Sequence, residues 1–279
     1  MKMRRILCSL AATLALTLGA QTVERPVLSS YTVEAGSAHL VETYLSPLKY
    51  SGWGTALGYE RMQAMRFDPD RWTMQLRGRL GLHGTRNPAR NATMWDVDLE
   101  LAWGMMRRFK LPEGFTIMAG GSTGVDAGVF YNARNSNNPA AAKAAWTVRA
   151  LGAAVWNGRV GRLPLCLRYQ AELPLAGMFF SPEYGELYYE IYLGNHKGLL
   201  RGAWPGNYFR LNNLLTCDLR LGRTNLRVGY RFDVLSTKAS RIVTRRIGHY
   251  FVFGIANEWI SLGARNTLSE KTRIINALY

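Results

Sequence analysis

Residues 225–234 read Asn-Leu-Arg-Val-Gly-Tyr-Arg-Phe-Asp-Val, and every second side chain in this stretch is apolar. The intervening residues are charged, polar or glycine. Successive side chains of a β-strand point to opposite faces, whereas one face of a helix repeats every three to four residues. This stretch therefore predicts a strand with one apolar face and one charged face.

The same alternation recurs in five further stretches, at 72–83, 95–105, 165–173, 186–193 and 215–221. Several of them have about ten residues or more, whereas strands of soluble proteins usually have about five or six. A tilted strand needs about nine to eleven residues to cross a lipid bilayer. The length therefore favours strands that span a membrane, and the protein is predicted to be all-β.

Short turns and longer polar connections alternate between the predicted strands. Asp68-Pro69-Asp70 and Asn157-Gly158 are turn sequences, while 84–93, 132–145 and 174–186 are longer polar connections. This rhythm is typical of a closed antiparallel transmembrane β-barrel. The alternation and the turns together predict eleven strands, at 37–46, 53–66, 72–84, 94–109, 114–131, 146–157, 164–174, 186–195, 207–222, 225–236 and 247–260.

A single-chain bacterial barrel has an even number of strands, so we predict about 12, within a range of about 10 to 14. Residues 272–279 are the candidate for a further strand. One extracellular loop is expected to hold a short helix at 139–145. Asn138 is suited to cap it, Pro139 suits its first turn, and alanines follow.

The N-terminus has the features of an export signal. The first five residues carry three cations, and the apolar stretch 6–18 and the small residues Gly19 and Ala20 follow. That order is typical of a secretory signal peptide. The predicted organisation is a signal peptide at 1–20, an N-terminal segment at 21–36, the β-barrel at 37–260 and a polar C-terminal extension or final strand at 261–279.

Alternation alone does not show which face of the wall lies outside, since a soluble lipocalin-like barrel or sandwich turns its apolar face inward. The signal peptide, the strand length and the aromatic residues near strand ends favour lipid on the outside. We therefore expect a protein of the bacterial outer membrane, with membrane lipids, lipopolysaccharide and the barrel-assembly machinery as partners. The cations that we expect near phosphorylated headgroups are Arg86, Arg90, Arg134, Lys143, Arg201, Arg245 and Arg246.

With lipid outside, the charged faces line the lumen. Arginines of 72–84 are expected beside the aspartates of 94–109, and the charges of 207–222 beside those of 225–236, so ion pairs fill a partly dehydrated interior. This predicts a structural or interaction role, with a small selective pore as the alternative. The expected lumen-lining residues are Arg77, Arg79, Asp96, Asp98, Glu100, Arg168, Glu172, Glu190, Asp218, Arg220, Arg227, Arg231 and Asp233.

The chain is strongly basic, with 35 Lys and Arg against 19 Asp and Glu and a net charge of +16. Such a balance raises nucleic acid as a partner. The arginines of the predicted strands stand singly at every second position, however, and not in runs beside stacking aromatics. Together with the predicted export, this placement excludes nucleic acid from the expected partners.

The sequence contains none of the common nucleophile, phosphate-loop or zinc motifs, so we predict no catalytic residue, no metal site and no cofactor. An enzyme is not the leading interpretation. A lipid-modifying hydrolase of the outer membrane stays as a second alternative, because His249 shares the face of Phe251 and Phe253 and would face lipid. The position two residues after that histidine is Phe251 and not a serine.

Several short segments carry a resemblance: Tyr44–Pro47, Tyr50–Gly52, Asn135–Pro139, Phe179–Gly185, Tyr188–Glu190, Val228–Arg231 and His249–Phe251. Over residues 38–260, they resemble an uncharacterised family of exported Bacteroidota proteins. The resemblance implies a β-barrel and an outer-membrane location. The family is a domain of unknown function, so it implies no catalytic residues.

Overall fold

The computed structural model describes residues 23–136, 138–161, 163–185, 187–221, 224–259 and 272–278. The predicted signal peptide at 1–20 lies outside the described residues. Among the described residues, no helix has the length and apolarity that a membrane-spanning helix needs.

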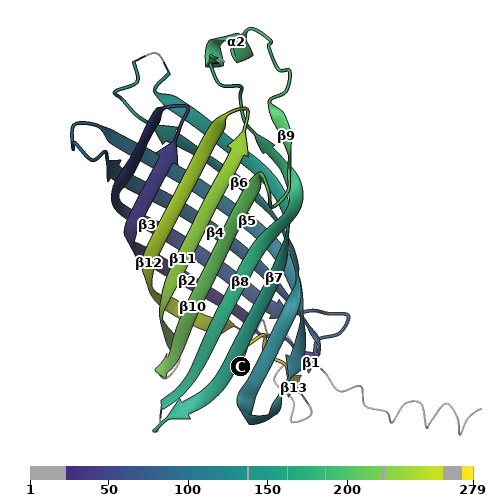
Figure 1. Ribbon diagram of the computed structural model, residues 1–279. Helices are drawn as coiled ribbons and strands as arrows, with labels where there is room; N and C mark the ends of the chain where they lie inside the picture. Colours follow the sequence, from purple (N-terminus) through teal and green to yellow (C-terminus); the bar gives the residue numbers. More distant parts are fainter. Residues whose placement is uncertain are drawn as a thin grey trace, which may run out of the picture.

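Ten long antiparallel strands form a closed barrel (Figure 1). Each strand pairs with the next, β8 pairs with β10, and β12 pairs back with β2 along sixteen residues to close the ring. The strands have 14 to 21 residues. They are β2 (Val27–Glu42), β3 (Ser46–Ala64), β4 (Trp72–Arg86), β5 (Thr93–Lys110), β6 (Phe115–Tyr131), β7 (Ala140–Val160), β8 (Leu163–Phe180), β10 (Tyr208–Leu221), β11 (Thr224–Ala239) and β12 (Ile242–Trp259).

The wall beside β8 is made of two pieces. The short strand β9 (Leu200–Ala203) pairs with Gly177–Phe180 at the upper end of β8, and β10 pairs with Leu165–Glu172 below it. Between them the backbone turns, and the amides of Asn207 and Tyr208 both donate to the carbonyl of Trp204. The interruption lets the long loop at 181–199 leave the barrel rim.

The two ends of the barrel differ. The upper end carries the 181–199 loop with the short helix α2 (Tyr188–Tyr192) (Figure 1). The 3-10 turn η1 (Pro112–Gly114) joins β5 to β6 at the lower end. A small parallel pair, β1 (Val23–Glu24) with β13 (Arg273–Ile274), also lies at the lower end. Both described ends of the chain are therefore on the same side of the barrel.

The segment 275–278 reaches from this pair into the lower mouth of the barrel. Arg108 Nη1 donates to the carbonyl of Asn276 at 2.5 Å, and Asn157 Nδ2 donates to the carbonyl of Leu278 at 2.8 Å. Leu278 is buried in an apolar cluster with Met106 and Met118. Residues that follow the barrel in the sequence thus occupy part of the lower mouth.

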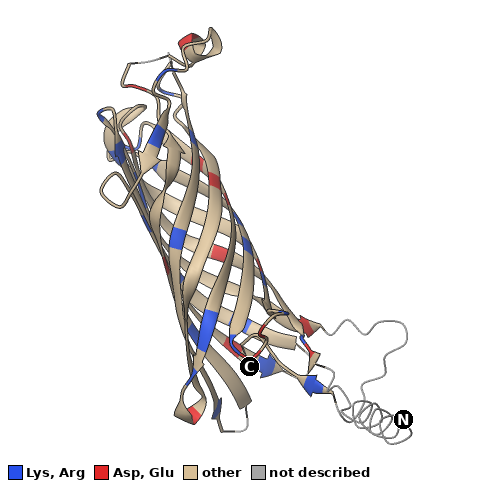
Figure 2. Ribbon diagram, turned by 90° about the vertical axis from the view of Figure 1, so that its right-hand side faces the viewer, with Lys and Arg blue, Asp and Glu red and all other residues tan. Residues whose placement is uncertain are grey.

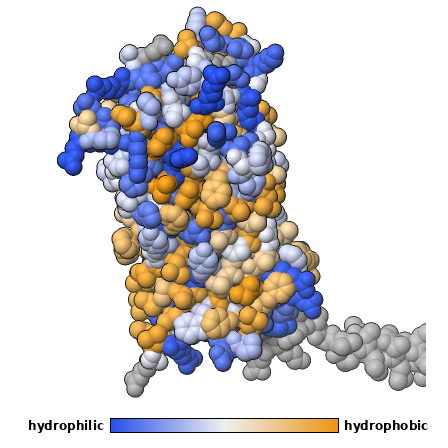
Figure 3. All heavy atoms as spheres, viewed as in Figure 1, coloured by the Kyte–Doolittle hydropathy of each residue, from blue (hydrophilic) through white to orange (hydrophobic). Residues whose placement is uncertain are grey.

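The distribution of polarity is the reverse of that in a soluble protein. On the outside, Leu99 is 41% and Trp103 is 42% exposed, whereas Arg227 is 1% and Asp98 is 7% exposed. Figure 3 shows apolar residues over the middle and lower wall, with hydrophilic residues gathered around the upper end. The apolar faces point outward and the charged faces inward.

The predicted fold class is confirmed as an all-β closed antiparallel barrel. The ring has ten strands, which lies inside the predicted range but below the expected twelve. The predicted first strand at 37–46 begins too late, because β2 begins at Val27. Its early part alternates weakly, being rich in Ser, Thr, Gly and Ala. Residues 273–274 add only to the outside pair and not to the ring.

Two predictions of local structure are wrong, and both concern connections at the upper end of the barrel. The helix at 139–145 is absent, since β7 begins at Ala140 and pairs with β6 from Tyr131 onward. Helix propensity of alanine is a weak preference that strand pairing overrides. The strand at 186–195 is instead the loop that contains α2, where the Glu190 carboxylate accepts a hydrogen bond from the Leu187 amide at 3.3 Å.

Candidate functional site

The interior of the barrel is layered. Apolar side chains gather near the upper rim, around Leu40 and Phe130 in one cluster and around Phe179 and Tyr208 in another, and near the lower mouth around Met62. Buried charges lie between these layers. Figure 2 shows that both signs of charge are distributed along the strands of the wall. The charged middle layer is the most unusual feature of the molecule, because a buried charge is costly unless it is paired.

Glu60 is the acceptor for arginines from two other parts of the wall. Its two oxygens receive Nη1 and Nη2 of Arg168 at 2.8 Å each, a bidentate pair. Nη1 of Arg227 lies 2.7 Å from Glu60 Oε2, and the same guanidinium donates to both oxygens of Asp218. In the ring order β3 and β8 are five strands apart in either direction. The Glu60–Arg168 pair therefore spans the barrel from one wall to the opposite one.

A second group surrounds Glu100. Arg210 Nη2 donates to it at 2.7 Å and Arg149 Nη1 at 3.0 Å. Asp126 receives Arg149 Nη2 at 2.6 Å and also accepts a hydrogen bond from Arg210. Arg77, 3.6 Å from Glu100, pairs in addition with Glu172. Each arginine here is shared between two carboxylates, so the group does not depend on any single hydrogen bond.

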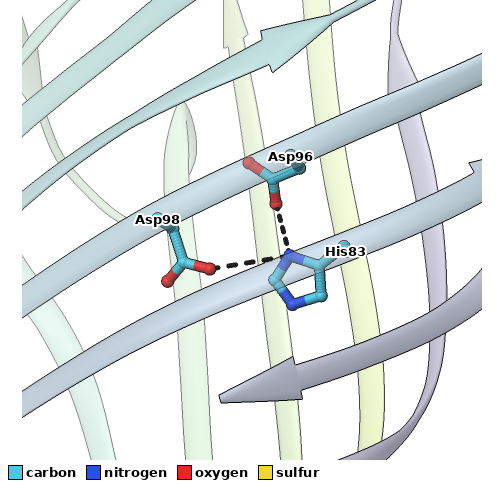
Figure 4. A group of neighbouring side chains, drawn as sticks. All are labelled: His83, Asp96 and Asp98. Carbon is cyan, nitrogen blue, oxygen red and sulfur yellow. Dashed lines mark ion pairs between the residues drawn. The ribbon is translucent and has the colours of Figure 1, made fainter. Parts of the chain in front are cut away.

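The third group contains a buried histidine (Figure 4). His83 Nδ1 lies 2.9 Å from Asp96 Oδ2 and 3.6 Å from Asp98 Oδ1, and its Nε2 lies 2.9 Å from the Tyr250 hydroxyl. Arg246 Nη1 lies 3.0 Å from Asp96 Oδ2 and 2.8 Å from Asp98 Oδ1. Both ring nitrogens and both carboxylates therefore face partners within the protein.

His83, Asp96 and Asp98 also present one ligand atom each within 4.8 Å, the spacing of a metal site. The guanidinium of Arg246 already lies against both carboxylates. A divalent cation would have to displace that buried arginine and leave its charge without partners, which is strongly unfavourable. The donor set therefore fits an ion-pair cluster better than a metal centre.

The structure brings most of the predicted lumen residues together. Eleven of the thirteen are buried, and Glu34 joins Arg79 at 2.9 Å and Arg231 at 2.8 Å. Arg220 is exposed at the lower end of β10. Glu190 does not line the lumen, because it lies on α2 in the upper loop. The buried eleven are Arg77, Arg79, Asp96, Asp98, Glu100, Arg168, Glu172, Asp218, Arg227, Arg231 and Asp233.

Sequence reasoning missed several members of the network. Glu34 preceded the predicted barrel, and Arg246 stood one residue before the last predicted strand. The others lay within predicted strands, and for Arg149 the alternation with the outward Trp146 and Val148 was a usable signal. The missed residues are Glu34, Glu60, His83, Asp126, Arg149, Arg210, Arg246 and Tyr250.

A cavity lies above the charged layer. It measures about 570 Å³, including solvent at its mouth, and its lining includes Phe130, Lys143 and Arg210. Tyr188 of α2 anchors the long loop beside this end, because the Ala142 amide donates to its hydroxyl at 2.7 Å. Burial raises the pKa of Tyr188 to about 12, so the hydroxyl keeps its proton at neutral pH.

Glycines make room for the long interior side chains. A Cβ on Gly124 would lie 2.5 Å from the guanidinium carbon of Arg149, which is fixed by Glu100 and Asp126. Replacing Gly124 by valine is expected to push Arg149 aside and lower the free energy of unfolding by about 1–3 kcal/mol. Urea unfolding in detergent micelles measures this loss in the free energy of unfolding. Gly202→Val is the control, because nothing lies within 4 Å of its Cβ position, and an equal loss in both variants would contradict the prediction.

The fold and its interior define a ten-stranded antiparallel barrel with an apolar outer wall and an ion-paired lumen. The chain belongs to the family described as "Protein of unknown function (DUF3316)", which matches residues 3–266. No curated protein matches the sequence. This match confirms that the chain carries a domain of unknown function, as the resemblance in the sequence implied.

Similar solved structures include two autotransporter domains and a FadL homologue. The β domain of the Bordetella autotransporter BrkA has 11% identity and a TM-score of 0.40, covering 84% of this chain and 100% of that one. The translocator domain of the autotransporter NalP from Neisseria meningitidis has 11% identity and a TM-score of 0.39, covering 92% and 96%. A FadL homologue of Pseudomonas aeruginosa has 10% identity and a TM-score of 0.31, covering 84% and 90%. The strand pairing above establishes the barrel independently of these likenesses.

Proposed function

We propose that this protein is a bacterial outer-membrane β-barrel with a closed, ion-paired lumen, which acts as a structural or interaction protein rather than as a pore. The observation that carries the proposal is the reversal of polarity across the wall. Leu99 and Trp103 face outward while Asp98 and Arg227 are buried. In water this arrangement would expose a large apolar surface and bury charges at the same time.

Lipid around the wall removes that conflict. Every backbone group in a closed barrel finds a partner in a neighbouring strand, as a hydrocarbon surrounding requires. Strands of 14 to 21 residues exceed the length that a tilted strand needs to cross a bilayer. The ends of the described part of the chain at the lower mouth and the longer loops at the upper rim favour a periplasmic lower end and an extracellular upper end.

The closed lumen favours a structural role over a pore. The Glu60–Arg168 pair crosses the full width of the barrel, and the segment 275–278 occupies part of the lower mouth. An open channel would instead need charges that face water along its length. The 181–199 loop with α2 is then the part best placed to meet partners outside the cell.

We also propose that lipopolysaccharide contacts the upper rim. Arg86 and Arg245 are exposed there and point away from the lumen. Two of the cations expected at headgroups do not qualify, because Arg246 is buried inside and Lys143 Nζ lies 2.8 Å from the buried Glu42. Phosphate groups of the outer leaflet would meet the outward-facing cations.

Location and closure are tested separately. We expect the protein in the outer-membrane fraction and expect unboiled protein to migrate differently from boiled protein on a gel. A soluble protein without such a shift would overturn the proposed location.

In planar bilayers we expect no stable conductance steps after insertion, with protease resistance of the barrel as the proof that insertion occurred. Reproducible steps from the unmodified protein would establish the pore alternative instead.

A further inference from the structure

A serine and a histidine are hydrogen-bonded on the outer face of the barrel near its upper rim. His39 Nδ1 lies 2.9 Å from Ser51 Oγ, and the two residues are direct partners in the β2–β3 ladder. Ser51 is exposed and His39 is half-buried. With the ring proton on Nε2, the Ser51 hydroxyl donates to Nδ1, which is the arrangement of a nucleophile and its base.

The surroundings of the pair are polar and basic within an otherwise apolar wall. Arg86 of β4 is the direct partner of Ser51 on its other side, and Lys49 precedes it by two residues on the same face of β3. Both cations are exposed. A phosphate carried by a molecule at this place would find two positive charges near the serine hydroxyl, one directly across the ladder and one two residues along the strand.

The position along the wall corresponds to a lipid headgroup region. Trp53 follows Ser51 by two residues on the same outer face and stacks edge-on against Trp95, with ring centroids 5.9 Å apart. Tryptophans gather at the boundary between hydrocarbon and headgroups in membrane barrels. The serine therefore lies just above that boundary, where the ester bonds of lipids are found and water is present.

We propose that Ser51 and His39 form a catalytic pair that hydrolyses acyl esters of phosphate-bearing lipids at the outer surface of the barrel. This inference rests on the proposed location in a membrane. It assigns the lipid-hydrolase chemistry to a different histidine from the one that the sequence suggested. His249 lies instead 2.6 Å from the Tyr230 hydroxyl, with Ser37 as its ladder partner.

The chemistry has two balanced steps. Ser51 Oγ attacks the acyl carbonyl carbon while its proton passes to His39 Nδ1, and the bond to the lipid alkoxide breaks as that proton is returned to the leaving oxygen. Water then attacks the acyl-serine while His39 Nδ1 takes up its proton. The fatty acid is released as that proton passes to Ser51 Oγ and restores the hydroxyl. Lys49 and Arg86 hold the lipid phosphate and place the ester beside the serine.

The first test is covalent labelling of the purified full chain in detergent by a fluorophosphonate probe. The serine oxygen would bond to phosphorus, fluoride would leave, and mass spectrometry would locate the adduct on Ser51. We expect Ser51→Ala to abolish the label and His39→Ala to slow it by about 100-fold or more. Ser37→Ala and His249→Ala, which change neighbouring residues of the same face, are expected to label like the unmodified protein.

The second test measures fatty-acid release from vesicles of phosphatidylethanolamine and, in a separate arm, from vesicles that contain lipopolysaccharide. Release in either arm that Ser51→Ala reduces by about 100-fold or more supports the proposal and identifies the lipid class. Release that survives this substitution, or neither label nor release, overturns it. The outer-membrane fraction and the gel shift are read on the same preparations, so failure of the hydrolase is distinguished from failure of the proposed location.

Discussion

Replacing Glu60 by leucine is expected to lower the free energy of unfolding by about 3–5 kcal/mol, because it removes the acceptor of two buried guanidinium groups. Arg168 would lose both of its bonds to that carboxylate, and Arg227 would keep Asp218 as its only carboxylate, together with the Ser30 hydroxyl. A buried charge without a partner is what makes such a deletion costly. Urea unfolding in micelles, followed by tryptophan fluorescence, measures the change.

A second variant separates lost pairing from lost packing. Glu60→Leu combined with Arg168→Met removes both charges of the pair that crosses the barrel, so it should be more stable than Glu60→Leu alone. Glu183→Leu is the matched control. Its pair with Arg201 is largely exposed, and such pairs contribute about 0–1 kcal/mol. A Glu60→Leu protein as stable as this control would show that the interior is hydrated enough to tolerate the unpaired charge.

Replacing Leu101 by arginine is expected to cost about 2–4 kcal/mol, since the side chain would enter hydrocarbon near the middle of the bilayer. Leu101 lies near the centre of β5 and is 52% exposed. In a soluble barrel an arginine at a half-exposed site would be nearly neutral. The sign and size of this effect therefore distinguish lipid from water around the wall. Reversible unfolding in lipid vesicles is the appropriate measurement.

A second position on the same strand, at a different depth in the bilayer, provides the control for this experiment. Phe109 is also exposed and points outward, but it lies at the lower end of the same strand. An arginine there would reach the headgroups, and the expected cost falls to about 0–1 kcal/mol. Equal costs at the two positions would contradict a bilayer centred on the barrel. A loss at Leu101 with little loss at Phe109 would support it.

Period-two alternation was sufficient to predict which way side chains point. Strand geometry alone fixes that Arg227 and Leu226 lie on opposite faces, whatever their partners. It also predicted pairs between adjacent strands, such as Arg79 with Asp98 and Arg227 with Asp218. Both are local consequences of an antiparallel ladder.

Partners across the lumen lay beyond such reasoning. Glu60 and Arg168 are 108 residues apart, and they meet because a ring of ten strands places β3 opposite β8. A ring of twelve would place another strand there. The Ser51–His39 pair was missed for a related reason. The strand predicted before that turn ended at 46, and the strand predicted after it began at 53. The pairing register of the two strands was therefore undefined.

The position of residues 275–278 has a consequence for the order of assembly. They lie inside the lower mouth and contact β5 and β7, whereas the wall they follow ends at β12, which is joined to β2. A peptide cannot be seated within a ring whose far wall has not yet formed. We therefore expect these residues to dock after the ring has closed, and formation of the hydrogen bond from Asn157 Nδ2 to the Leu278 carbonyl would report that a nascent barrel has matured.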